Sequence, residues 1–471
     1  MNPLALSWSL AVPLLLGILL LRLLGLRHRD DRIGFPAWSW LLGCLALAAL
    51  LRLCREIGLP VGVWWAAPLP ALGLLLLVPR LLGARRRAAA ASASAVPPTP
   101  AWFHAFVAVG VLFCLWFALV GFDRPCLEGD EGNIWSLKAK SLLVDWDGSY
   151  GGPGFAAAQV WNLHPDYPQL NPWLQAWVYA LTGVPDFEQF ANRWPIQLCD
   201  VALFVATAAA LRRLVAPILA AMLAALVLLE PEFRDLCRTA YADGMVAFGV
   251  VVALDAFLRW RSGGPRAFAW LAALGFAFAL ASKNEATLYL ASLALALPIA
   301  RWLLRREPLC GGLVGRNLAL LLPPILVAVN TTMWNRRFGM KSDLFGANPT
   351  GKSMFALMAE QWRERVPLLA GEAARAVAAL EHSHAVFGLL LFAAIVVPRR
   401  AFGRELALPL LALFGSLAGL HLVYVGSFLP LRFHLDTSYL RVLFQLLPAA
   451  VVLLGACLAA GWPRRQDPEP A

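Results

Sequence analysis

The sequence carries few charged residues, and this shortage excludes an ordinary soluble globular protein. Asp, Glu, Lys and Arg make up only 15% of the 471 residues, whereas soluble domains typically carry about a quarter. Apolar residues account for 60% of the chain, and the mean hydropathy is +0.66. We therefore expect an all-α polytopic membrane protein.

Paired cysteine motifs are also missing. The chain has eight cysteines but no Cys-x-x-Cys pair, and most of them lie inside apolar segments, as Cys44, Cys114, Cys199 and Cys457 do. This pattern indicates neither a zinc site nor a disulfide framework.

Acidic residues are outnumbered by basic ones, 29 against 40, which gives a net charge of +11. Such an excess is sometimes typical of nucleic-acid binding. Here, however, the arginines fall in short clusters between apolar runs, as membrane orientation signals do. We therefore expect no nucleic-acid partner.

About thirteen apolar segments qualify as membrane spans, because a span needs about 20 apolar residues, or fewer when neighbouring helices bury it. The first has no basic segment before it and runs directly into Arg27-His28-Arg29. We interpret it as a retained span with the N-terminus outside, not as a cleaved signal peptide. The segments are 3–26, 37–53, 62–79, 102–122, 189–211, 214–230, 241–259, 267–281, 286–303, 317–334, 384–398, 405–426 and 439–460.

The basic clusters test this arrangement, because positively charged loops remain in the cytoplasm. With thirteen spans, all the arginine clusters fall on one face, which we assign to the cytoplasm. The opposite face receives all five lysines and most of the acidic residues. We therefore expect a multi-pass protein of the cell inner membrane with its C-terminus in the cytoplasm. The clusters lie near residues 27–32, 80–87, 212–213, 259–266, 301–306, 399–404 and 464–465.

This topology divides the chain into four regions. Residues 1–84 form a three-span extension, residues 85–100 a cytoplasmic linker rich in Ala, Ser and Pro, residues 101–462 the transmembrane core, and residues 463–471 a cytoplasmic tail. The core includes two long outer loops, 123–188 and 335–383.

The first outer loop contains two predicted helices. In residues 133–146, Ile134, Leu137 and Val144 recur near helical spacing with Lys138 and Lys140 between them, which is typical of an amphipathic helix at a membrane surface. Residues 172–181 should form a second, aromatic-rich helix at the level of the lipid headgroups.

Polar residues that are far apart in sequence gather on the outer face, and we interpret them as one site. Asp130 and Glu131 directly follow an early span and are flanked by Gly129 and Gly132. The other members are His164, Asp166, Tyr167, Asp243, Lys283, Glu285, Arg432, His434 and Arg441.

Seven of these residues also have a simpler interpretation. A carboxylate at a helix start satisfies free N–H groups and the helix dipole. Ionisable residues beside a span are costly, however, and are therefore functional candidates. The simpler roles are capping for Asp130, Glu131 and Asp243, mutual pairing for Lys283 and Glu285, bonding to a backbone carbonyl for His164, and headgroup anchoring for Arg441.

An outer acidic pair after an early span, followed by an amphipathic helix, resembles the first extracytoplasmic loop of GT-C-fold glycosyltransferases. The chain is most similar to the dolichyl-phosphate-mannose protein mannosyltransferases and their bacterial relatives, which include lipid A aminoarabinose transferases. Residues 164–172, His-Pro-Asp-Tyr-Pro-Gln-Leu-Asn-Pro, resemble the corresponding loop of bacterial members. The similarity covers residues 102–462, and its short motifs gain specificity from their order and sidedness.

The resemblance implies a GT-C-like fold and transfer of a sugar from a polyprenyl-phosphate-linked donor to a lipid, glycan or protein acceptor on the extracytoplasmic face. It implies active-site roles for Asp130, Glu131 and Asp243, and basic residues that hold the lipid phosphate. The chain departs from the family pattern in two ways. Three spans precede the core, and no soluble acceptor-binding domain follows it, so the acceptor and the sugar stay open.

The chemistry of such a transfer agrees with the residue types. A base must deprotonate the incoming hydroxyl, and a carboxylate beside a second acidic group suits that role, so we predict that Asp130 is the base. Lys283, Arg432 or Arg441 would stabilise the departing phosphate. Asp130 and Asp243 could instead hold a divalent metal ion, although no dense carboxylate cluster accompanies them.

Two other classes of membrane protein are alternatives. A transporter or flippase predicts inverted repeats and charges near the middle of several spans, and neither is evident. An O-antigen polymerase or ligase predicts a late outer loop rich in arginine. The loop 335–383 does contain several, namely Arg336, Arg337, Arg363, Arg365 and Arg375.

Overall fold

The computed structural model describes residues 2–82, 98–121, 129–144, 164–183, 190–303, 318–342, 350–379, 381–403 and 405–461. Within these ranges every regular element is helical, as the sequence predicts. The principal helices are α1 (Pro3–Leu24), α2 (Gly34–Glu56), α3 (Pro68–Leu82), α4 (Ala101–Val120), α5 (Leu137–Val144), α7 (Leu170–Thr182), α8 (Trp194–Leu214), α9 (Pro217–Leu229), α10 (Pro231–Leu236), α11 (Asp243–Arg261), α12 (Arg266–Ser282), α13 (Glu285–Leu303), α14 (Leu322–Arg337), α15 (Met354–Ala378), α16 (Ala385–Val396), α17 (Pro398–Ala401), α18 (Ala407–Gly426), α19 (Leu431–Thr437), α20 (Tyr439–Phe444) and α21 (Leu447–Gly461). Shorter turns are η1 (Val61–Ala66), the π-helix η3 (Glu131–Ser136), η4 (Phe190–Arg193) and η5 (Leu318–Leu321).

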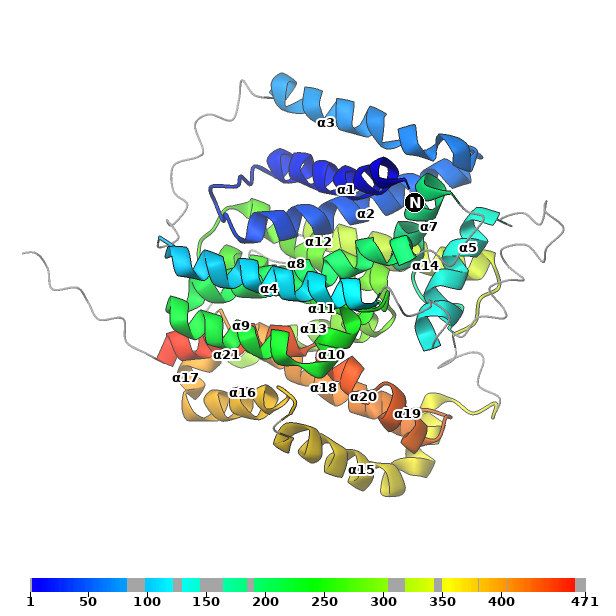
Figure 1. Ribbon diagram of the computed structural model, residues 1–471. Helices are drawn as coiled ribbons and strands as arrows, with labels where there is room; N and C mark the ends of the chain where they lie inside the picture. Colours follow the sequence, from blue (N-terminus) through cyan, green and yellow to red (C-terminus); the bar gives the residue numbers. More distant parts are fainter. Residues whose placement is uncertain are drawn as a thin grey trace, which may run out of the picture.

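Most of the long helices lie side by side in a layered bundle (Figure 1). Helix α3 lies along one edge and α15 along the opposite edge, with α8, α11 and α12 between them. Helices α8 and α11 are buried over most of their length. The short helices α5, α19 and α20 gather at one end of the bundle, and we call this the polar end.

Each of the thirteen predicted spans contains a helix. Six of these helices, α1, α2, α4, α13, α18 and the segment that ends with α8, are long and apolar enough to cross a membrane. Several others are apolar but shorter. The multi-pass membrane architecture is therefore confirmed, while the count of thirteen crossings stays a prediction.

Large apolar side chains on the outside of the bundle support this architecture. Leu112 and Trp116 of α4, Met333 of α14 and Phe392 of α16 are all well exposed. A soluble monomer rarely exposes contiguous apolar surfaces of this kind, whereas a lipid bilayer covers them at no cost.

Helices α11 and α12 approach each other closely because glycines line their contact. A Cβ atom on Gly249 of α11 would lie 2.7 Å from the carbonyl oxygen of Gly275 of α12, a distance that real side chains do not adopt. Small residues allow membrane helices to pack at this range. The start of α11 and the end of α12 are therefore held next to each other.

The opposite end of the bundle is joined by a buried chain of charges. Arg259 of α11 pairs with Asp31, in the turn before α2, and with Asp255, 2.8 Å away on its own helix. Asp255 also accepts from Arg213 of α8 at 3.0 Å. Asp31 in turn accepts from the backbone N–H of Gly34 at 2.8 Å, at the start of α2. The first two helices thus contact the rest of the bundle directly.

The helices of the first outer loop form, but their burial differs from expectation. Lys138 was expected on a water-facing side, yet it is fully buried, and its Nζ donates to the His164 carbonyl at 2.7 Å. Residues 170–179 of helix α7 are all buried, and the expected position of this helix at headgroup level stays a prediction. The indole of Trp177 donates to the Ser9 carbonyl at 2.9 Å. The neighbouring helices α1, α2 and α5 pack around α7.

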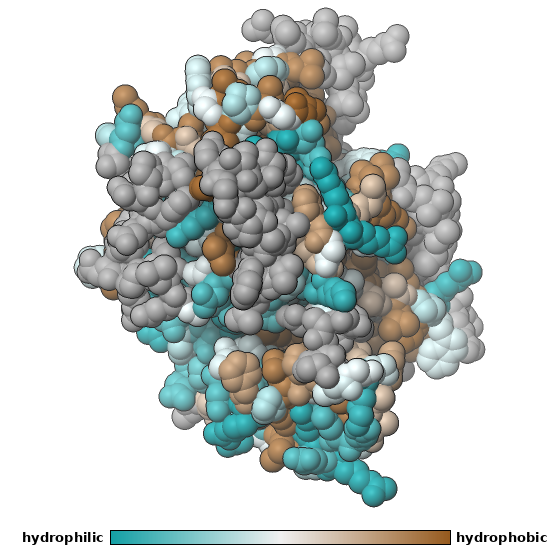
Figure 2. Space-filling model, turned by 90° about the vertical axis from the view of Figure 1, so that its right-hand side faces the viewer, coloured by the Kyte–Doolittle hydropathy of each residue, from teal (hydrophilic) through white to brown (hydrophobic). Residues whose placement is uncertain are grey.

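Figure 2 shows the molecule from the polar end, along the helices. The visible described surface mixes hydrophilic with hydrophobic residues, and hydrophilic side chains are abundant. This is where a bundle that crosses a membrane would meet water.

Candidate functional site

A chain of alternating charges joins four separate segments at the polar end. Arg441 Nη2 donates to Asp130 Oδ2 at 2.5 Å, and its Nε lies 3.5 Å from Asp243 Oδ2. Lys283 Nζ lies 2.9 Å from Asp243 Oδ1 and 2.9 Å from Glu285 Oε1. The structure therefore brings together five residues that the sequence analysis selected, across more than 300 positions of chain.

Helix ends place these side chains. Asp243 and Glu285 are the first residues of α11 and α13, and Lys283 follows directly after α12. Because all three lie at helix ends on the same side of the bundle, the helices bring their charges together. The Asp243 oxygens contact side chains, namely Lys283, Arg441 and Gln445, so the capping interpretation does not account for this carboxylate.

Two buried polar residues complete the surroundings of Asp243. The amide of Gln445 donates to Asp243 Oδ1 at 2.6 Å, and Tyr289 donates to Gln445 Oε1 at 2.7 Å. Buried polar groups fully bonded in this way hold one geometry. Neither residue was selected from the sequence, because a tyrosine inside the apolar α13 and a glutamine in the turn after α20 give no local signal.

Access to solvent differs along the chain of charges. The Asp243 and Lys283 side chains are only 2% and 5% exposed, whereas Asp130 is 33% and Arg441 17% exposed. Burial alone would lower the pKa of Lys283, but Asp243 and Glu285 outweigh that effect and raise the pKa above its usual value. Lys283 is therefore a charged ammonium at neutral pH, and Asp130 and Arg441 form the accessible edge of the site.

Glu131 points away from its neighbour Asp130 and forms a separate ion pair. Arg193 of η4 holds it through two bonds, Nε to Oε1 at 2.5 Å and Nη2 to Oε2 at 2.9 Å. The backbone N–H of Ala240 donates to Oε1 at 3.0 Å, and Arg193 also donates to the Gly121 carbonyl. Both side chains are almost fully buried. Arg193 was not selected from the sequence, because it lies at the start of an apolar segment and no nearby motif marks it.

The turn at residues 164–167 forms a wall beside the charges. The Tyr167 ring is stacked between the rings of His164, at 4.6 Å, and Trp135, at 5.5 Å. Lys283 Nζ lies 5.7 Å from the Tyr167 ring centre. Burial first, and then the nearby Glu285, Asp243, Asp166 and Asp130 carboxylates, raise the pKa of Tyr167 well above its usual value, so its phenol keeps its proton.

Asp166 has a different position in this turn. Its Oδ2 accepts from Asn284 at 2.7 Å, and its carbonyl accepts from Asn335 of α14 at 2.9 Å. Asp166 is buried and thus ties the turn to the segment that carries Lys283. It is adjacent to the charge chain but is not part of it.

Arg432 and His434 lie apart from the charge chain. Arg432 is 76% exposed and pairs with Asp436 within α19 at 3.2 Å. His434 is 2.6 Å from Ser427 Oγ. Burial, followed by the charges of Arg365 and His164, lowers the pKa of His434 to about 4. His434 is therefore neutral at pH 7, and neither residue offers a cation to the ion-paired cluster.

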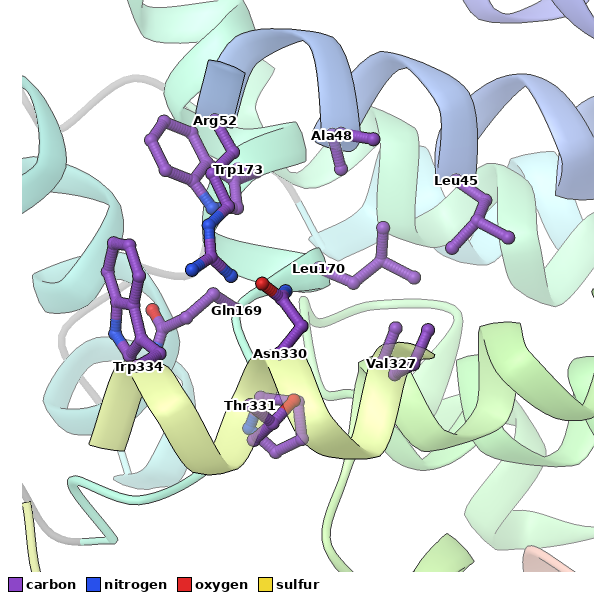
Figure 3. Close-up of a pocket in the computed structure, with 13 residues that line it drawn as sticks. Leu45, Ala48, Arg52, Gln169, Leu170, Trp173, Val327, Asn330, Thr331 and Trp334 are labelled. Atoms are coloured by element: carbon purple, nitrogen blue, oxygen red, sulfur yellow. The ribbon is translucent and has the colours of Figure 1, made fainter. Parts of the chain in front are cut away.

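A pocket opens next to this site, between α2, α7, α12 and α14 (Figure 3). Apolar side chains such as Leu45, Leu170 and Val327 line one part, and Arg52, Asn330 and Gln169 line the other. The Arg52 guanidinium lies 4.4 Å over the Trp334 ring. Ala281, which also lines the pocket, is only two residues before Lys283. The pocket thus offers an apolar channel with a cationic end.

The residues considered for a metal ion are occupied by cations of the protein itself. Arg441 contacts both Asp130 and Asp243, and Lys283 contacts Asp243 as well. A divalent ion held by these two carboxylates would have to displace the guanidinium between them. The arrangement fits an arginine-bridged acidic pair better than a metal centre.

Comparison with known proteins gives one finding. Residues 166–326 match the family model described as dolichyl-phosphate-mannose-protein mannosyltransferase. The matched range covers about a third of the chain and includes Asp243, Lys283 and Glu285, but neither Asp130 nor Arg441. No curated protein and no solved structure matches the chain. The resemblance predicted from the sequence is confirmed, and with the apolar helices it supports a multi-pass membrane glycosyltransferase in general terms.

Proposed function

We propose that the protein transfers a sugar from a polyprenyl-phosphate-linked donor to a hydroxyl of a lipid, glycan or protein acceptor. We place the reaction on the extracytoplasmic face of the cell inner membrane. The observation that carries this proposal is the chain of charges from Asp130 through Arg441 and Asp243 to Lys283. It supplies an accessible carboxylate and a partly exposed guanidinium in direct contact, at the end of an apolar bundle.

Asp130 acts as the general base in this proposal. Arg441 engages Oδ2, so an acceptor hydroxyl approaches Oδ1 from the exposed side. The hydroxyl proton passes to the Asp130 carboxylate while the acceptor oxygen bonds to the anomeric carbon of the sugar. The bond between that carbon and the phosphate oxygen breaks, and the polyprenyl phosphate leaves with the electron pair. Such proton transfer contributes about a hundredfold to ten-thousandfold in rate.

Arg441 is the residue best placed to receive the leaving phosphate. It is the most exposed cation of the charge chain, and its guanidinium can keep one contact with a carboxylate while another N–H meets a phosphate oxygen. Lys283 is almost fully buried and already contacts two carboxylates. We therefore assign Lys283 to positioning Asp243 and, through it, Arg441.

The remaining selected residues support this geometry. Glu131 and Arg193 hold the segment that bears Asp130, because their buried ion pair, with two hydrogen bonds, fixes the start of η3. The half-buried His164 ring, stacked on Tyr167, presents an aromatic surface beside the charges, which suits stacking against a sugar ring. The pocket beside α14 is suited to the first isoprene units of the donor, with Arg52 near its polar end.

The competing functions have less support. The arginines expected for an O-antigen polymerase or ligase do not converge, since Arg365 donates to backbone carbonyls of Ser427 and Leu429, Arg375 pairs with Glu372, and Arg337 pairs with Glu56. A polyprenyl-linked glycan flippase stays an alternative. Transport of a lipid-linked glycan without formation of a new glycosidic bond would favour it.

The proposal is tested by complementation with Asp130→Asn. Mass spectrometry of envelope glycans and lipids, with and without the gene, identifies the transferred sugar. Asparagine keeps the size of the side chain and caps a helix as well as aspartate does, but it accepts no proton. We expect Asp130→Asn to lower the amount of product about a hundredfold or more at an unchanged protein level.

A matched control is Asp436→Asn, because Asp436 also pairs with an arginine but lies outside the charge chain. This variant should restore the product fully. Near-normal product from Asp130→Asn would remove Asp130 as the base and direct attention to Glu131, Asp243 and His164.

A further inference from the structure

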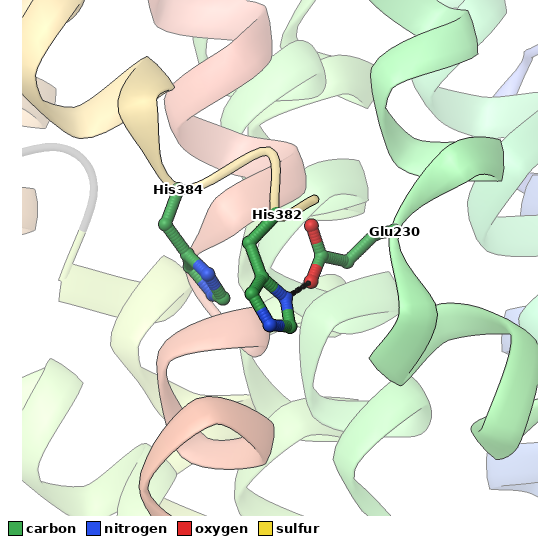
Figure 4. Close-up of side chains that lie close together, drawn as sticks. All are labelled: Glu230, His382 and His384. Atoms are coloured by element: carbon green, nitrogen blue, oxygen red, sulfur yellow. Dashed lines mark hydrogen bonds and ion pairs between the residues drawn. The ribbon is translucent and has the colours of Figure 1, made fainter. Parts of the chain in front are cut away.

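A second polar cluster lies between the α9–α10 turn and the α15–α16 turn. Glu230 separates α9 from α10, and His382 and His384 precede α16. One ligand atom from each of the three lies within 4.8 Å of the others. Figure 4 shows the two histidine rings side by side and Glu230 reaching toward them from the facing α9–α10 turn.

The cluster has two facing motifs with the same spacing. One is Glu230-Pro231-Glu232, and the other is His382-Ser383-His384. His382 Nδ1 lies 2.8 Å from Glu230 Oε1 and 3.4 Å from Glu232 Oε2. One carboxylate and two imidazoles therefore converge, with the Glu232 carboxylate beside His382, and this donor set suits Zn²⁺.

His384 is the feature that an ordinary ion pair does not explain. Its side chain is fully buried, and neither ring nitrogen has a hydrogen-bond partner in the described part of the chain. A buried polar atom without a partner costs about 1–3 kcal/mol. The ion pair between His382 and Glu230 gives the His384 ring nitrogens no hydrogen-bond partner. A metal ion, by contrast, would accept the lone pair of one of these nitrogens.

The backbone around Glu230 is held in place independently of any ion. Glu230 is completely buried, and its Oε2 accepts from the backbone N–H of Ser383. Ser383 Oγ donates to the Leu226 carbonyl at 2.7 Å. The two turns are therefore already fixed against each other, so the side chains need only small rotations to reach zinc distances of about 2.0–2.2 Å.

We propose that Glu230, His382 and His384 bind a Zn²⁺ ion, with Glu232 as the nearest fourth ligand. The ion would fasten the end of the outer segment that contains α15 to the helices of the core. It would act as a structural clasp, separate from the sugar-transfer site proposed above.

The test is metal binding by the purified full-length protein in detergent or nanodiscs. Metal is first removed with a chelator, and Zn²⁺ alone is then added. After dialysis, the bound zinc is measured by elemental mass spectrometry. We expect about one ion per chain for a site of this kind. Thermal stability should rise on zinc addition, because an ion that binds only the folded state stabilises it.

Two variants separate the site from general metal binding. His384→Phe keeps an aromatic ring, which in the native chain stacks on Phe387, and Glu230→Gln keeps the hydrogen-bonding shape. Both should weaken zinc binding at least about tenfold and abolish the thermal shift. The control His28→Ala, at an exposed histidine elsewhere, should bind zinc as the native protein does.

Cobalt substitution provides a readout that does not depend on the variants. Co²⁺ added to the native protein should give visible absorption bands that Zn²⁺ removes. Equal zinc retention by native protein and both variants would overturn the proposal. So would native protein that retains no zinc and shows no thermal shift.

Discussion

At the scale of single residues, Arg441 is the residue that links the two carboxylates of the candidate site. It contacts Asp130 and Asp243, and its guanidinium lies 4.6 Å over the Tyr241 ring. A planar group with several N–H donors can make these contacts together, and a lysine ammonium cannot. The residue is therefore defined by its geometry as much as by its charge.

We predict that Arg441→Lys keeps the protein folded but lowers sugar transfer about a hundredfold, the effect typical of losing one donor that stabilises transition-state charge. The product in envelope extracts is the measurement, beside the thermal stability of the purified variant. Arg432→Lys is the control, because Arg432 forms a similar but exposed ion pair. Equal product from both variants would argue against a phosphate contact at Arg441.

Gly129, which precedes Asp130, is constrained by its backbone. Its φ is +59°, and a Cβ atom there would lie 2.9 Å from the Tyr241 hydroxyl. Only glycine adopts this conformation without strain. The sequence places this glycine beside the acidic pair, and the structure gives it a left-handed conformation directly before Asp130, which contacts Arg441.

At the scale of helices, the pocket beside α14 gives a test of donor binding. Val327 lines the pocket, and Val329, two residues further along the same helix, is exposed. Positions two apart on a helix lie on nearly opposite faces. Val327→Trp should fill the pocket and weaken binding of undecaprenyl phosphate about tenfold, because overpacking costs about 1–3 kcal/mol.

Native mass spectrometry of the purified protein with undecaprenyl phosphate measures this effect. Val329→Trp adds the same volume on the lipid-facing side and should bind like the native chain. If both variants bind equally well, the isoprene units occupy another surface.

The contact between α11 and α12 supports a prediction about stability. Gly249→Ala introduces a Cβ atom 2.7 Å from a backbone oxygen that cannot rotate away, so the helices must separate. We expect a cost of about 1–3 kcal/mol and a lower melting temperature. Gly371→Ala in α15 meets no atom within 4 Å and should be neutral or slightly stabilising. A melting temperature unchanged by Gly249→Ala would contradict the close packing.

At the scale of the whole molecule, the thirteen-span topology predicts which residues are accessible from outside the cell. The thirteen-span arrangement places Gly151 outside and Ser94 in the cytoplasm, and both lie outside the described residues. A cysteine introduced at Gly151 should react with a membrane-impermeant label in intact cells, while one at Ser94 should react only after lysis. Labelling of a cysteine at Ser94 in intact cells would contradict the predicted orientation or number of spans. The site residues would then no longer be expected on one membrane face.

Much of the fold was predictable because apolar length is a local property of sequence. Each predicted span contains a helix, and even the short apolar run of α16 was found. The charge chain was predictable only as a set of residues on one face. Its pairing was not, since Arg441 and Asp130 are 311 positions apart and no local pattern links them.

Other features could not be predicted from the sequence, for physical reasons. Lys138 was expected on the polar side of an amphipathic helix because it lies between apolar residues at helical spacing, but a backbone carbonyl and two aromatic rings surround it. Glu131 was grouped with its neighbour Asp130, although successive side chains on a helix point in different directions. The cluster of Glu230, His382 and His384 was missed because its two halves lie in separate turns.

The close pairing of α11 and α12 bears on how the chain enters the membrane during synthesis. The two helices are joined by a short turn, residues 262–265, and carry Asp243 and Lys283 at their far ends. Under the proposed topology, both charged groups must be carried across the hydrocarbon layer. A helical hairpin that is delivered as one unit moves an anion and a cation together, as a dipole and not as two separate ions. The ion pair that positions Arg441 in the mature protein would thus first lower the free-energy cost of inserting the hairpin, since paired charges cross the bilayer at lower cost than isolated ones.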